Sequence, residues 1–371
     1  MSNVAKTRVL VTRFPYESQF GGEELHTLAV VSGLDNRGVP SFFLGSCPVL
    51  LRGFLDRHFD VKKVWLAKPP VTFWRLISFT LLSPVLFLLC GVYLWSAKKR
   101  WKVSTVYMLS LSEKLLMTPW AKFFGMKILW LEHARIGRWL TKNPWRVLYT
   151  FLSRFSTVVV TSNAMEPILR PYAKTVVVIP CGTIVEEASN ISAELASFMK
   201  EGFAIGCVAR LSHDKGVDML VQAVHSKPDT RLVLVGQGPL KKDLQKRVDP
   251  ARVRFVSMGT RAEMMAFYKA LDLFVLPARE MDPFGMAGAE AMWSGVPCIL
   301  SNKCGLAFDL HDGKEALIVE PCVPEIDRAI KKLMKHPELS REIALNGQRF
   351  VRSHYVLEDM IDRFDKLIEL M

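Results

Sequence analysis

The sequence alternates short β-rich runs with helix-length segments, and it does so twice along its 371 residues. Strands that alternate with helices favour a mostly parallel sheet covered on both faces, because each crossover between parallel strands needs a long connection. In the first half, a strand at residues 8–12 precedes a Gly21-Gly22 loop and a helix over residues 23–36. Further strands are predicted at residues 41–44, 61–66, 105–109, 127–131, 157–161 and 175–179.

The same pattern starts again at Phe203, after a polar and acidic passage. Strands are predicted at residues 203–210, 231–236, 253–259 and 273–277, with helices at residues 217–225, 240–247 and 262–270 between them. We therefore predict an α/β chain with two Rossmann-like domains. The predicted divisions are a first domain over 1–185, a linker over 186–202, a second domain over 203–350 and a C-terminal helix over 351–371.

Charge is distributed unevenly between the two halves of the chain. Residues 1–185 contain 24 Lys and Arg against 9 Asp and Glu, a formal charge of +15, whereas residues 186–371 carry −2. This asymmetry indicates that the first half faces a polyanion, either nucleic acid or an anionic membrane surface. A generally basic soluble protein is the alternative.

The cysteines and the N-terminus bear on the compartment. Seven cysteines, an odd number, are widely scattered, with no Cys-x-x-Cys pair and no Cys/His cluster at zinc spacing. The first ten residues lack the apolar core of a secretory signal. These features predict a cytoplasmic protein without a metal site.

An apolar stretch of 22 residues, Leu76–Ala97, contains no charged side chain, although Pro84 and Gly91 are expected to kink or loosen a helix there. A helix of this length is about 33 Å long, enough to cross a bilayer core of roughly 30 Å. Three placements are open: a spanning helix, a helix in the membrane face and a buried core helix. Spanning would separate the strands at residues 61–66 and 105–109, which we expect to belong to one sheet, so we favour the membrane face.

Two cations, Arg210 and Lys215, flank the turn between the strand at residues 203–210 and the helix at residues 217–225. A diphosphate at this turn would meet both side chains and the N–H groups of the helix start. A pair of solvated surface cations would show the same spacing. On this motif alone, both a diphosphate site and a solvated pair therefore stay open.

Two acids lie eight positions apart after the strand at residues 273–277. Asp282 precedes a Phe284-Gly285 turn, and Glu290 lies about one turn into the next helix among Ala and Met residues. A buried acid needs partners, and we expect a ligand rich in hydroxyls to supply them. A structural acid satisfied by backbone amides is the alternative for this segment.

These motifs occur in an order that identifies a family. They are the Gly21-Gly22 loop, His133 after the strand at residues 127–131, Thr161-Ser162, Ile179 to Gly182, Arg210 with Lys215-Gly216, Val235 to Pro239, Gly259 and the segment from Asp282 to Met292. Over nearly its whole length the chain resembles the retaining family-4 glycosyltransferases, whose two Rossmann-like domains face a cleft in the fold called GT-B. The resemblance implies this fold, with the C-terminal helix packing back toward the first domain.

The resemblance also implies site residues. The catalytic residues would be Arg210 and Lys215, which bind the donor diphosphate, and His133, which approaches the donor sugar; a buried structural histidine is the alternative for His133. The donor-binding residues would include Glu290 at the ribose hydroxyls and Asp282 at the sugar. The full donor set is Gly22, Gly236, Gly238, Glu280, Asp282, Phe284, Gly285, Met286 and Glu290.

Two departures from the family pattern affect these roles. The family usually has Glu where this chain has Asp282, so Glu280 could share the role and the choice of donor sugar is open. The usual Pro-Asn-Gly reads Pro180-Cys181-Gly182, and no role is carried over to Cys181 or to Asp309. The chain contains no Asp-x-Asp, which predicts transfer without a metal or another cofactor.

The sequence thus predicts a metal-independent retaining glycosyltransferase. It would move a sugar from a UDP- or GDP-sugar to a lipid-linked or glycan acceptor, peripherally on the cytoplasmic face of an anionic membrane. The alternative from another class is a non-catalytic, membrane-associated scaffold with a degenerate sugar-nucleotide site. No nucleic-acid reading module is recognisable, so nucleic acid is not an expected partner.

Overall fold

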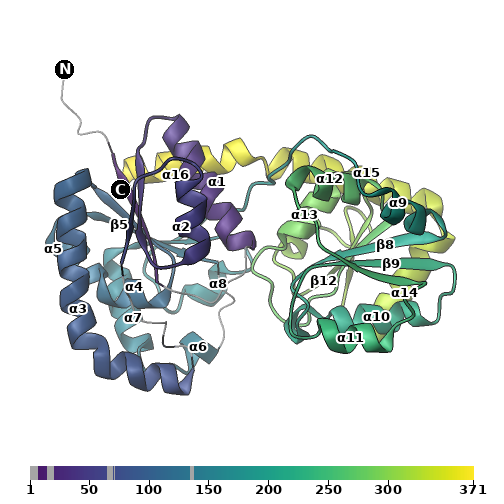
Figure 1. Ribbon diagram of the computed structural model, residues 1–371, viewed down its shortest axis with the longest axis horizontal. Coiled ribbons are helices and arrows are strands. Elements are labelled where there is room, and N and C mark those ends of the chain that lie inside the picture. The colour runs from purple at the N-terminus through teal and green to yellow at the C-terminus, as the bar shows by residue number, and fades with distance from the viewer. Residues whose placement is uncertain (1–6, 15–20, 65–69, 71, 134–137) are drawn as a thin grey trace. The chain divides into compact units, whose positions relative to one another are not determined.

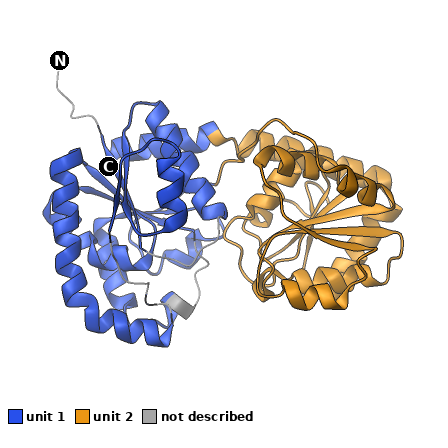
Figure 2. Ribbon diagram, in the orientation of Figure 1, with its two compact units in different colours: residues 1–180, 358–371 blue, residues 181–357 orange. Residues whose placement is uncertain are grey.

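The computed structural model describes residues 7–14, 21–64, 70, 72–133 and 138–371. The chain forms two compact units, unit 1 from residues 1–180 and 358–371 and unit 2 from residues 181–357 (Figure 2). Each unit contains one parallel sheet with helices packed against it (Figure 1). The predicted α/β class with two Rossmann-like domains is confirmed.

Unit 1 contains a seven-stranded sheet in the order β3-β2-β1-β4-β5-β6-β7. All seven predicted runs form strands, although the run predicted at 61–66 is a strand over Val61–Lys63 and residues 65–69 lie outside the described part. The strands are β1 Val9–Arg13, β2 Ser41–Gly45, β3 Val61–Lys63, β4 Thr105–Met108, β5 Lys127–Glu132, β6 Thr157–Val160 and β7 Val176–Val178. The helices are α1 Gly22–Asn36, α2 Pro48–Leu55, α3 Phe73–Trp101, α4 Leu111–Leu116, α5 Thr118–Phe123, α6 Arg138–Thr141, α7 Arg146–Leu152, η1 Ser153–Phe155, α8 Glu166–Leu169 and α16 Leu357–Leu370.

Unit 2 contains a six-stranded sheet in the order β10-β9-β8-β11-β12-β13. Its strands are β8 Phe203–Val208, β9 Thr230–Val235, β10 Val253–Val256, β11 Leu273–Leu276, β12 Cys298–Ser301 and β13 Leu317–Val319. Its helices are α9 Ala193–Lys200, η2 His213–Lys215, α10 Val217–His225, α11 Lys241–Arg247, α12 Arg261–Lys269, α13 Met286–Trp293, η3 Leu306–Asp309, α14 Val323–Lys335 and α15 Pro337–His354.

Both sheets reverse their strand order at one point. In unit 1 the reversal lies between β1 and β4, and in unit 2 between β8 and β11. The crossover helices lie on opposite sides of such a point, which leaves a crevice at the carboxyl ends of the two strands, where open α/β sheets bind ligands. Residues that bind a ligand are therefore expected in the loops after these four strands.

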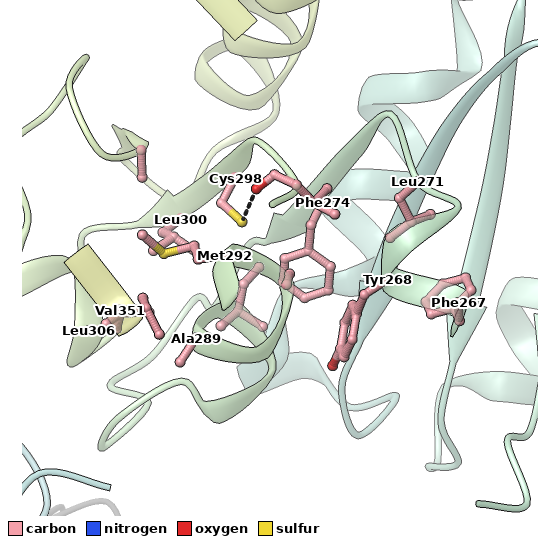
Figure 3. Close-up of a cluster of buried hydrophobic side chains, with 14 of the residues drawn as sticks. Phe267, Tyr268, Leu271, Phe274, Ala289, Met292, Cys298, Leu300, Leu306 and Val351 are labelled. Carbon is pink, nitrogen blue, oxygen red and sulfur yellow. Dashed lines mark hydrogen bonds between the residues drawn. The ribbon is translucent and has the colours of Figure 1, made fainter. Parts of the chain in front are cut away.

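The sheet of unit 2 is buried on both faces, because its strands are continuous apolar runs such as LVLV in β9 and LFVL in β11. On one face, α9, α12, α13 and α15 pack over a cluster that includes Tyr268, Phe274 and Met292, part of which is drawn in Figure 3. On the other face, α10, α11 and α14 pack over Ile205, Leu234 and Val275. This core fixes the base of α13, which carries Glu290.

The boundaries differ from those predicted. The units divide after Pro180, and the stretch 186–202, predicted as a linker, belongs to unit 2 and contains α9. The helix predicted over 351–371 is also divided: α15 ends at His354 and α16 begins at Leu357. Between them the Tyr355 carbonyl accepts a hydrogen bond from the Thr183 N–H (2.7 Å), and Val356 forms a β-bridge with Thr183. This pairing requires extended backbone, which stops the helix.

The C-terminal helix α16 returns to unit 1, as the family resemblance implies. Its buried side chains pack on α1 and β4: Ile361 lies over Gly33, where a Cβ would collide with the Ile361 side chain, and the Phe364 ring lies 6.1 Å from that of Tyr107. Arg37 at the end of α1 forms an ion pair with Asp362 (2.5 Å). Unit 1 is thus completed by a segment that follows unit 2 in the sequence.

Helix α3 connects β3 to β4 and contains the apolar stretch. The helix is continuous through Pro84, and Figure 1 shows that it bends. Because proline has no N–H, Pro84 cannot donate a hydrogen bond to the Thr80 carbonyl. The Ser83 hydroxyl donates to this carbonyl instead (2.8 Å). Gly91 lets the Trp120 ring of α5 lie directly against the helix, and the indole N–H donates to the Phe87 carbonyl (2.8 Å).

By length and composition alone, α3 qualifies as a helix that could cross a membrane. However, β3 and β4, the strands before and after it, belong to one sheet, as predicted. One face of α3 is buried through Phe79, Leu86 and Leu94, whereas Leu81 and Leu88 are 75% and 62% exposed. The alternative of a buried core helix is therefore wrong, because much of the apolar surface has no cover in the described part of the chain, and the favoured placement in the membrane face stays a prediction.

Replacing Phe364 with Ala should destabilise unit 1 by about 3–5 kcal/mol, because it opens a cavity between α16, α1 and β4. Trp293 is the only tryptophan of the nine outside residues 1–180, so tryptophan fluorescence in a urea titration reports mainly on unit 1. Leu370→Ala, at a side chain that is 78% exposed, is the control and should change stability by less than about 0.5 kcal/mol. Equal effects of the two variants would mean that α16 is not part of the folded unit.

Candidate functional site

The loop after β8 places both predicted diphosphate ligands at the reversal point of unit 2. The exposed Arg210 side chain donates to the Ser212 hydroxyl (3.2 Å) and forms an ion pair with Asp214 (3.2 Å). Lys215 ends the short helix η2, immediately before Gly216 and α10. Gly216 has a φ of +66°, and a side chain there would collide with the Pro277 carbonyl at the end of β11. A glycine is therefore needed for Lys215 to lie next to the loop after β11.

The two predicted sites meet in one ion pair. The Lys215 ammonium lies 2.8 Å from a carboxylate oxygen of Asp282, and both side chains remain partly exposed, at 22% and 16%. Burial alone would lower the pKa of Lys215, but the Asp282 carboxylate outweighs it, so the pKa lies above its usual value. Lys215 is consequently a fixed positive charge across the physiological pH range.

Further contacts join the loops after β8 and β11. The Asp214 carbonyl accepts hydrogen bonds from the backbone N–H groups of Arg279 (2.9 Å) and Glu280 (3.1 Å). The Arg279 guanidinium also binds Asp218 of α10 through both carboxylate oxygens, at 2.7 and 3.1 Å. This bidentate pair fixes the position of Glu280 in the loop ahead of Asp282.

The start of α13 is held against the loop after β12. The backbones of Asp282 and Cys304 form a parallel β-bridge. The Phe284 carbonyl accepts a hydrogen bond from the Leu306 N–H (2.6 Å), and the Phe284 ring is buried. Gly285 has a φ of +96°, and a Cβ there would collide with the Cys304 sulfur. Gly285 and Met286 thus begin α13 at a defined place, with the helix N-terminus at the carboxyl end of β11.

Glu290 is 4% exposed and already has protein partners. One carboxylate oxygen accepts from Arg261 (2.7 Å) and the other from the Tyr268 hydroxyl (2.9 Å). Burial raises the pKa of Glu290, and the contacts with Arg261 and Tyr268 offset only part of that rise. The expectation that a ligand would have to supply its partners is therefore wrong, and so is the alternative of backbone amides. Contact with a ribose stays a prediction.

Gly236 and Gly238 bring the loop after β9 against the loop that carries Arg210. Side chains at these positions would collide with the carbonyls of Ala209 and Leu211. The Leu211 N–H donates to the Gln237 carbonyl (2.9 Å), which ties the two loops together. The structure gives both glycines this packing role, and their contact with a donor stays a prediction.

In unit 1 the carboxyl ends of β1, β4 and β5 are lined by buried charged groups. Arg13, at the end of β1, is paired with Glu23, which follows Gly22 at the start of α1. Glu113 is fully buried and accepts hydrogen bonds from the N–H groups of Phe14 (3.3 Å) and Ser110 (2.6 Å). Burial raises the pKa of Glu113, an effect that Ser110 and Arg13 partly offset. These bonds join the end of β1 to the start of α1 and to the segment after β4.

A second buried pair supports the end of β5. Lys114 lies 2.7 Å from Glu132 and also donates to the Leu131 carbonyl (2.6 Å), and the Tyr149 hydroxyl donates to Glu132 (2.8 Å). Burial lowers the pKa of Lys114, while Glu132 acts in the opposite direction. Removing one partner of such a pair leaves an unpaired buried charge, which typically costs about 3–5 kcal/mol. The backbone ahead of His133 is therefore firmly positioned.

His133 follows β5 directly and is half-buried. Its Nε2 lies 2.8 Å from Nδ1 of His26 in α1, and the two rings meet edge to face. Burial, followed by the proximity of His26 and Arg13, holds the pKa of His133 well below its usual value. His133 is therefore neutral at pH 7, which the sequence alone did not indicate.

Sequence reasoning missed the residues whose hydrogen bonds and ion pairs fix the predicted site residues in place. Asp214, Asp218 and Arg279 fix the loops around Lys215, and Arg261 and Tyr268 hold Glu290. No local spacing marks these contacts, because Asp218 and Arg279 are 61 positions apart. Within the described ranges no group of three or more His, Cys, Asp or Glu residues is arranged to hold a metal ion.

The second unit is similar to proteins of a known family. Residues 190–350 match the family described as Glycosyl transferases group 1. The lipopolysaccharide core biosynthesis mannosyltransferase LpsB of Rhizobium meliloti is 33% identical over 169 residues, 42% of this chain and 48% of that protein. The GDP-mannose-dependent alpha-(1-6)-phosphatidylinositol monomannoside mannosyltransferase of Mycolicibacterium smegmatis is 27% identical over 178 residues, 42% of this chain and 47% of that protein. The matched region thus spans about half the length of these relatives.

Solved structures extend the likeness in fold to almost the whole chain. Anabaena Alr3699/HepE, solved in complex with UDP, superposes with a TM-score of 0.79 at 17% identity and covers 98% of this chain and 100% of its own. A glycosyltransferase from Rickettsia africae superposes equally well, with 17% identity and 98% of each chain covered. Residues 190–350 therefore match the glycosyl transferases group 1 family, within a chain that has the two-sheet GT-B fold.

Proposed function

We propose that the protein is a retaining glycosyltransferase that moves a sugar from a nucleotide sugar to a lipid-linked or glycan acceptor without a metal ion. The observation that carries the proposal is the Lys215–Asp282 pair at the reversal point of unit 2, in a domain of the group 1 family. A cation for the leaving diphosphate and an acid for the sugar hydroxyls lie side by side there.

Charge at the leaving group is the main chemical requirement of such a transfer. The bond from the anomeric carbon to the diphosphate breaks, the bond to the acceptor oxygen forms on the same face, and the acceptor proton passes to the departing phosphate oxygen. Lys215 and Arg210 would neutralise the charge that develops on the diphosphate, which is the role of a preorganised electrostatic site. Asp282 holds the Lys215 ammonium in place before the donor arrives.

The relatives support this class of substrates. One is named as GDP-mannose-dependent, and the Anabaena protein of the same fold was solved with UDP-glucose. We infer a UDP- or GDP-sugar donor for this chain, with its base and sugar to be determined by experiment. A purified protein that neither hydrolyses nor transfers from such donors would instead be a scaffold with a degenerate site.

Unit 1 would place the enzyme on a membrane surface. The apolar face of unit 1, which we define as the exposed apolar side chains of α3, α5 and α7, includes Trp74, Leu81, Leu88, Val92, Trp95, Phe123, Val147 and Phe151. Ring contact between Phe87 and Trp120 joins α3 to α5. Exposed apolar surface of this extent marks a site of interaction with another protein or a membrane.

Cations border the apolar face of unit 1, which favours an anionic lipid surface. Lys98, Lys99 and Arg100 end α3, and the Lys99 ammonium lies 4.0 Å from the centre of the Trp95 ring. Near an anionic membrane each cation contributes about 1 kcal/mol, whereas apolar insertion adds a term that salt does not screen. Attachment to the cytoplasmic membrane face would bring a lipid-linked acceptor to the enzyme.

Lys215→Ala should lower the rate of donor hydrolysis or transfer about 10²- to 10³-fold at saturating donor, because the lost charge acts mainly in the transition state. The assay is run with EDTA present, which also tests metal independence. Lys332→Ala, an exposed cation on α14, is the matched control and should match wild type. If the rate of the Lys215→Ala enzyme is within threefold of the wild-type rate, Lys215 does not neutralise the leaving diphosphate. If activity is recovered only with Mg²⁺ or Mn²⁺, the metal-free mechanism is contradicted.

Glu290→Gln should weaken binding of the free nucleoside diphosphate about 10- to 100-fold, because a charged hydrogen bond to the ribose is lost. Asp282→Asn should weaken binding of the intact nucleotide sugar more than that of the diphosphate, because its effect on the diphosphate is limited to the loss of the charge that faces Lys215. Isothermal titration calorimetry of each variant with the nucleoside diphosphate and with the nucleotide sugar measures both effects.

Since Glu290 is also held by Arg261 and Tyr268, Tyr268→Phe serves as the control, because it removes one internal hydrogen bond and keeps the carboxylate. Equal loss of diphosphate affinity in Glu290→Gln and Asp282→Asn would contradict the division of roles. A loss in Tyr268→Phe as large as in Glu290→Gln would show that internal packing, and not ribose contact, explains the effect.

Replacing Leu81, Leu88 and Val92 together with Ser should reduce binding to anionic liposomes at least about tenfold and make the remaining binding fully sensitive to salt. These side chains are 75%, 62% and 58% exposed, so the fold should be unaffected. Leu345→Ser, an exposed leucine of unit 2, is the control. Wild-type protein that stays in the supernatant with anionic liposomes at low salt would exclude the membrane proposal.

A further inference from the structure

The contact between His26 and His133 determines which nitrogen of each ring carries the proton. His26 is 1% exposed, and its Nδ1 lies 2.8 Å from Nε2 of His133. Its other nitrogen, Nε2, is buried without a hydrogen-bond partner among the described residues. Burial lowers the pKa of His26 to about 3, so the ring is neutral and has a single N–H.

Two arrangements of that proton are possible, and they differ in cost. With the proton on Nε2, His26 would bury an N–H that has no acceptor. With the proton on Nδ1, the N–H is donated to His133, and only an acceptor lone pair stays unfilled. Buried N–H groups without a partner are rarer in proteins than unfilled acceptors. The second arrangement is therefore favoured, with His26 as the donor.

The arrangement of His26 fixes that of His133. If Nε2 of His133 accepts the hydrogen bond, it has no proton, and the single proton of this neutral ring is on Nδ1. His133 is then neither a cation nor a base at Nε2. The group that it can offer to a ligand is a neutral Nδ1–H donor.

We propose that His26 is a positioning residue, which holds His133 as the neutral Nδ1–H tautomer, so that His133 offers a ligand hydroxyl a hydrogen-bond donor and not a base or a cation. The proposal rests on the proposed function for its ligand, but the tautomer itself does not depend on it. Phe364 of α16 also packs against His26, with the two ring centres 5.8 Å apart. The C-terminal helix therefore helps to hold the His26 ring in place.

The tautomer can be observed directly in the full-length protein. Long-range ¹H–¹⁵N correlation spectra of histidine-labelled protein distinguish a protonated ring nitrogen from an unprotonated one, and His133→Gln and His26→Asn assign the two signals. We expect both rings to be neutral near pH 7, each with its proton on Nδ1. A His133 signal protonated at Nε2 would overturn the proposal, whether or not the protein proves to be a transferase.

Variants of His26 test the consequence for catalysis. His26→Leu fills the space without a donor, so His133 should gain a population protonated at Nε2, and kcat should fall about 10- to 100-fold, as for other residues that orient a functional histidine. Affinity for the nucleoside diphosphate should not change. His26→Asn keeps an N–H donor where Nδ1 lies and should restore most of the lost kcat and the Nδ1–H signal of His133.

His225→Leu, at an exposed position of α10, is the matched control. If the Asn variant is as impaired as the Leu variant while His133 keeps its Nδ1 proton in both, His26 contributes only packing and the proposal is wrong. If His133 shows the expected tautomer changes but no variant or wild-type protein transfers sugar, the proposed function fails and the positioning role stands.

Discussion

The candidate site of unit 2 depends on one constraint, the close approach of the loops that follow β8 and β11. The Asp214 carbonyl binds two backbone N–H groups of the second loop, and the bidentate pair between Arg279 and Asp218 joins the same two segments. Gly216 permits the approach because any side chain there would meet the Pro277 carbonyl. Once these contacts form, the ammonium of Lys215 and the carboxylate of Asp282 have little freedom to lie anywhere except against each other.

Sequence reasoning found the two motifs of this candidate site separately, because each has a local pattern. Apolar β-rich runs predicted the strands, with Arg210 and Lys215 after one of them and Asp282 and Glu290 after another, and only the family resemblance assigned both motifs to one donor. Partners that lie far apart in sequence could not be found in this way. Arg261 and Tyr268 precede Glu290 by 29 and 22 positions, and nothing local marks them as its hydrogen-bond donors. The break at Tyr355 was missed for the same reason, since Thr183 causes it.

Unit 1 shows how tertiary context changes the meaning of a sequence feature. A stretch of 22 uncharged residues has the length of a membrane span, yet here its helix is the crossover between two strands of one sheet. One face of this helix packs on α4 and α5, and much of its remaining apolar surface is exposed, with a row of cations at the end of the helix. The same unit keeps Glu113, Lys114 and Glu132 buried at the carboxyl ends of its strands, where each finds a hydrogen-bond partner.

The return of α16 to unit 1 affects the order in which the protein can fold. Domains usually fold as they emerge during synthesis, the N-terminal one first. Unit 1 cannot follow this order to completion, because residues 358–371 are synthesised after all of unit 2. Until they arrive, Gly33, His26 and Tyr107 lack the side chains of α16 that pack on them. On the ribosome, unit 2 is therefore the first unit that can become fully native, although it is the second to be translated.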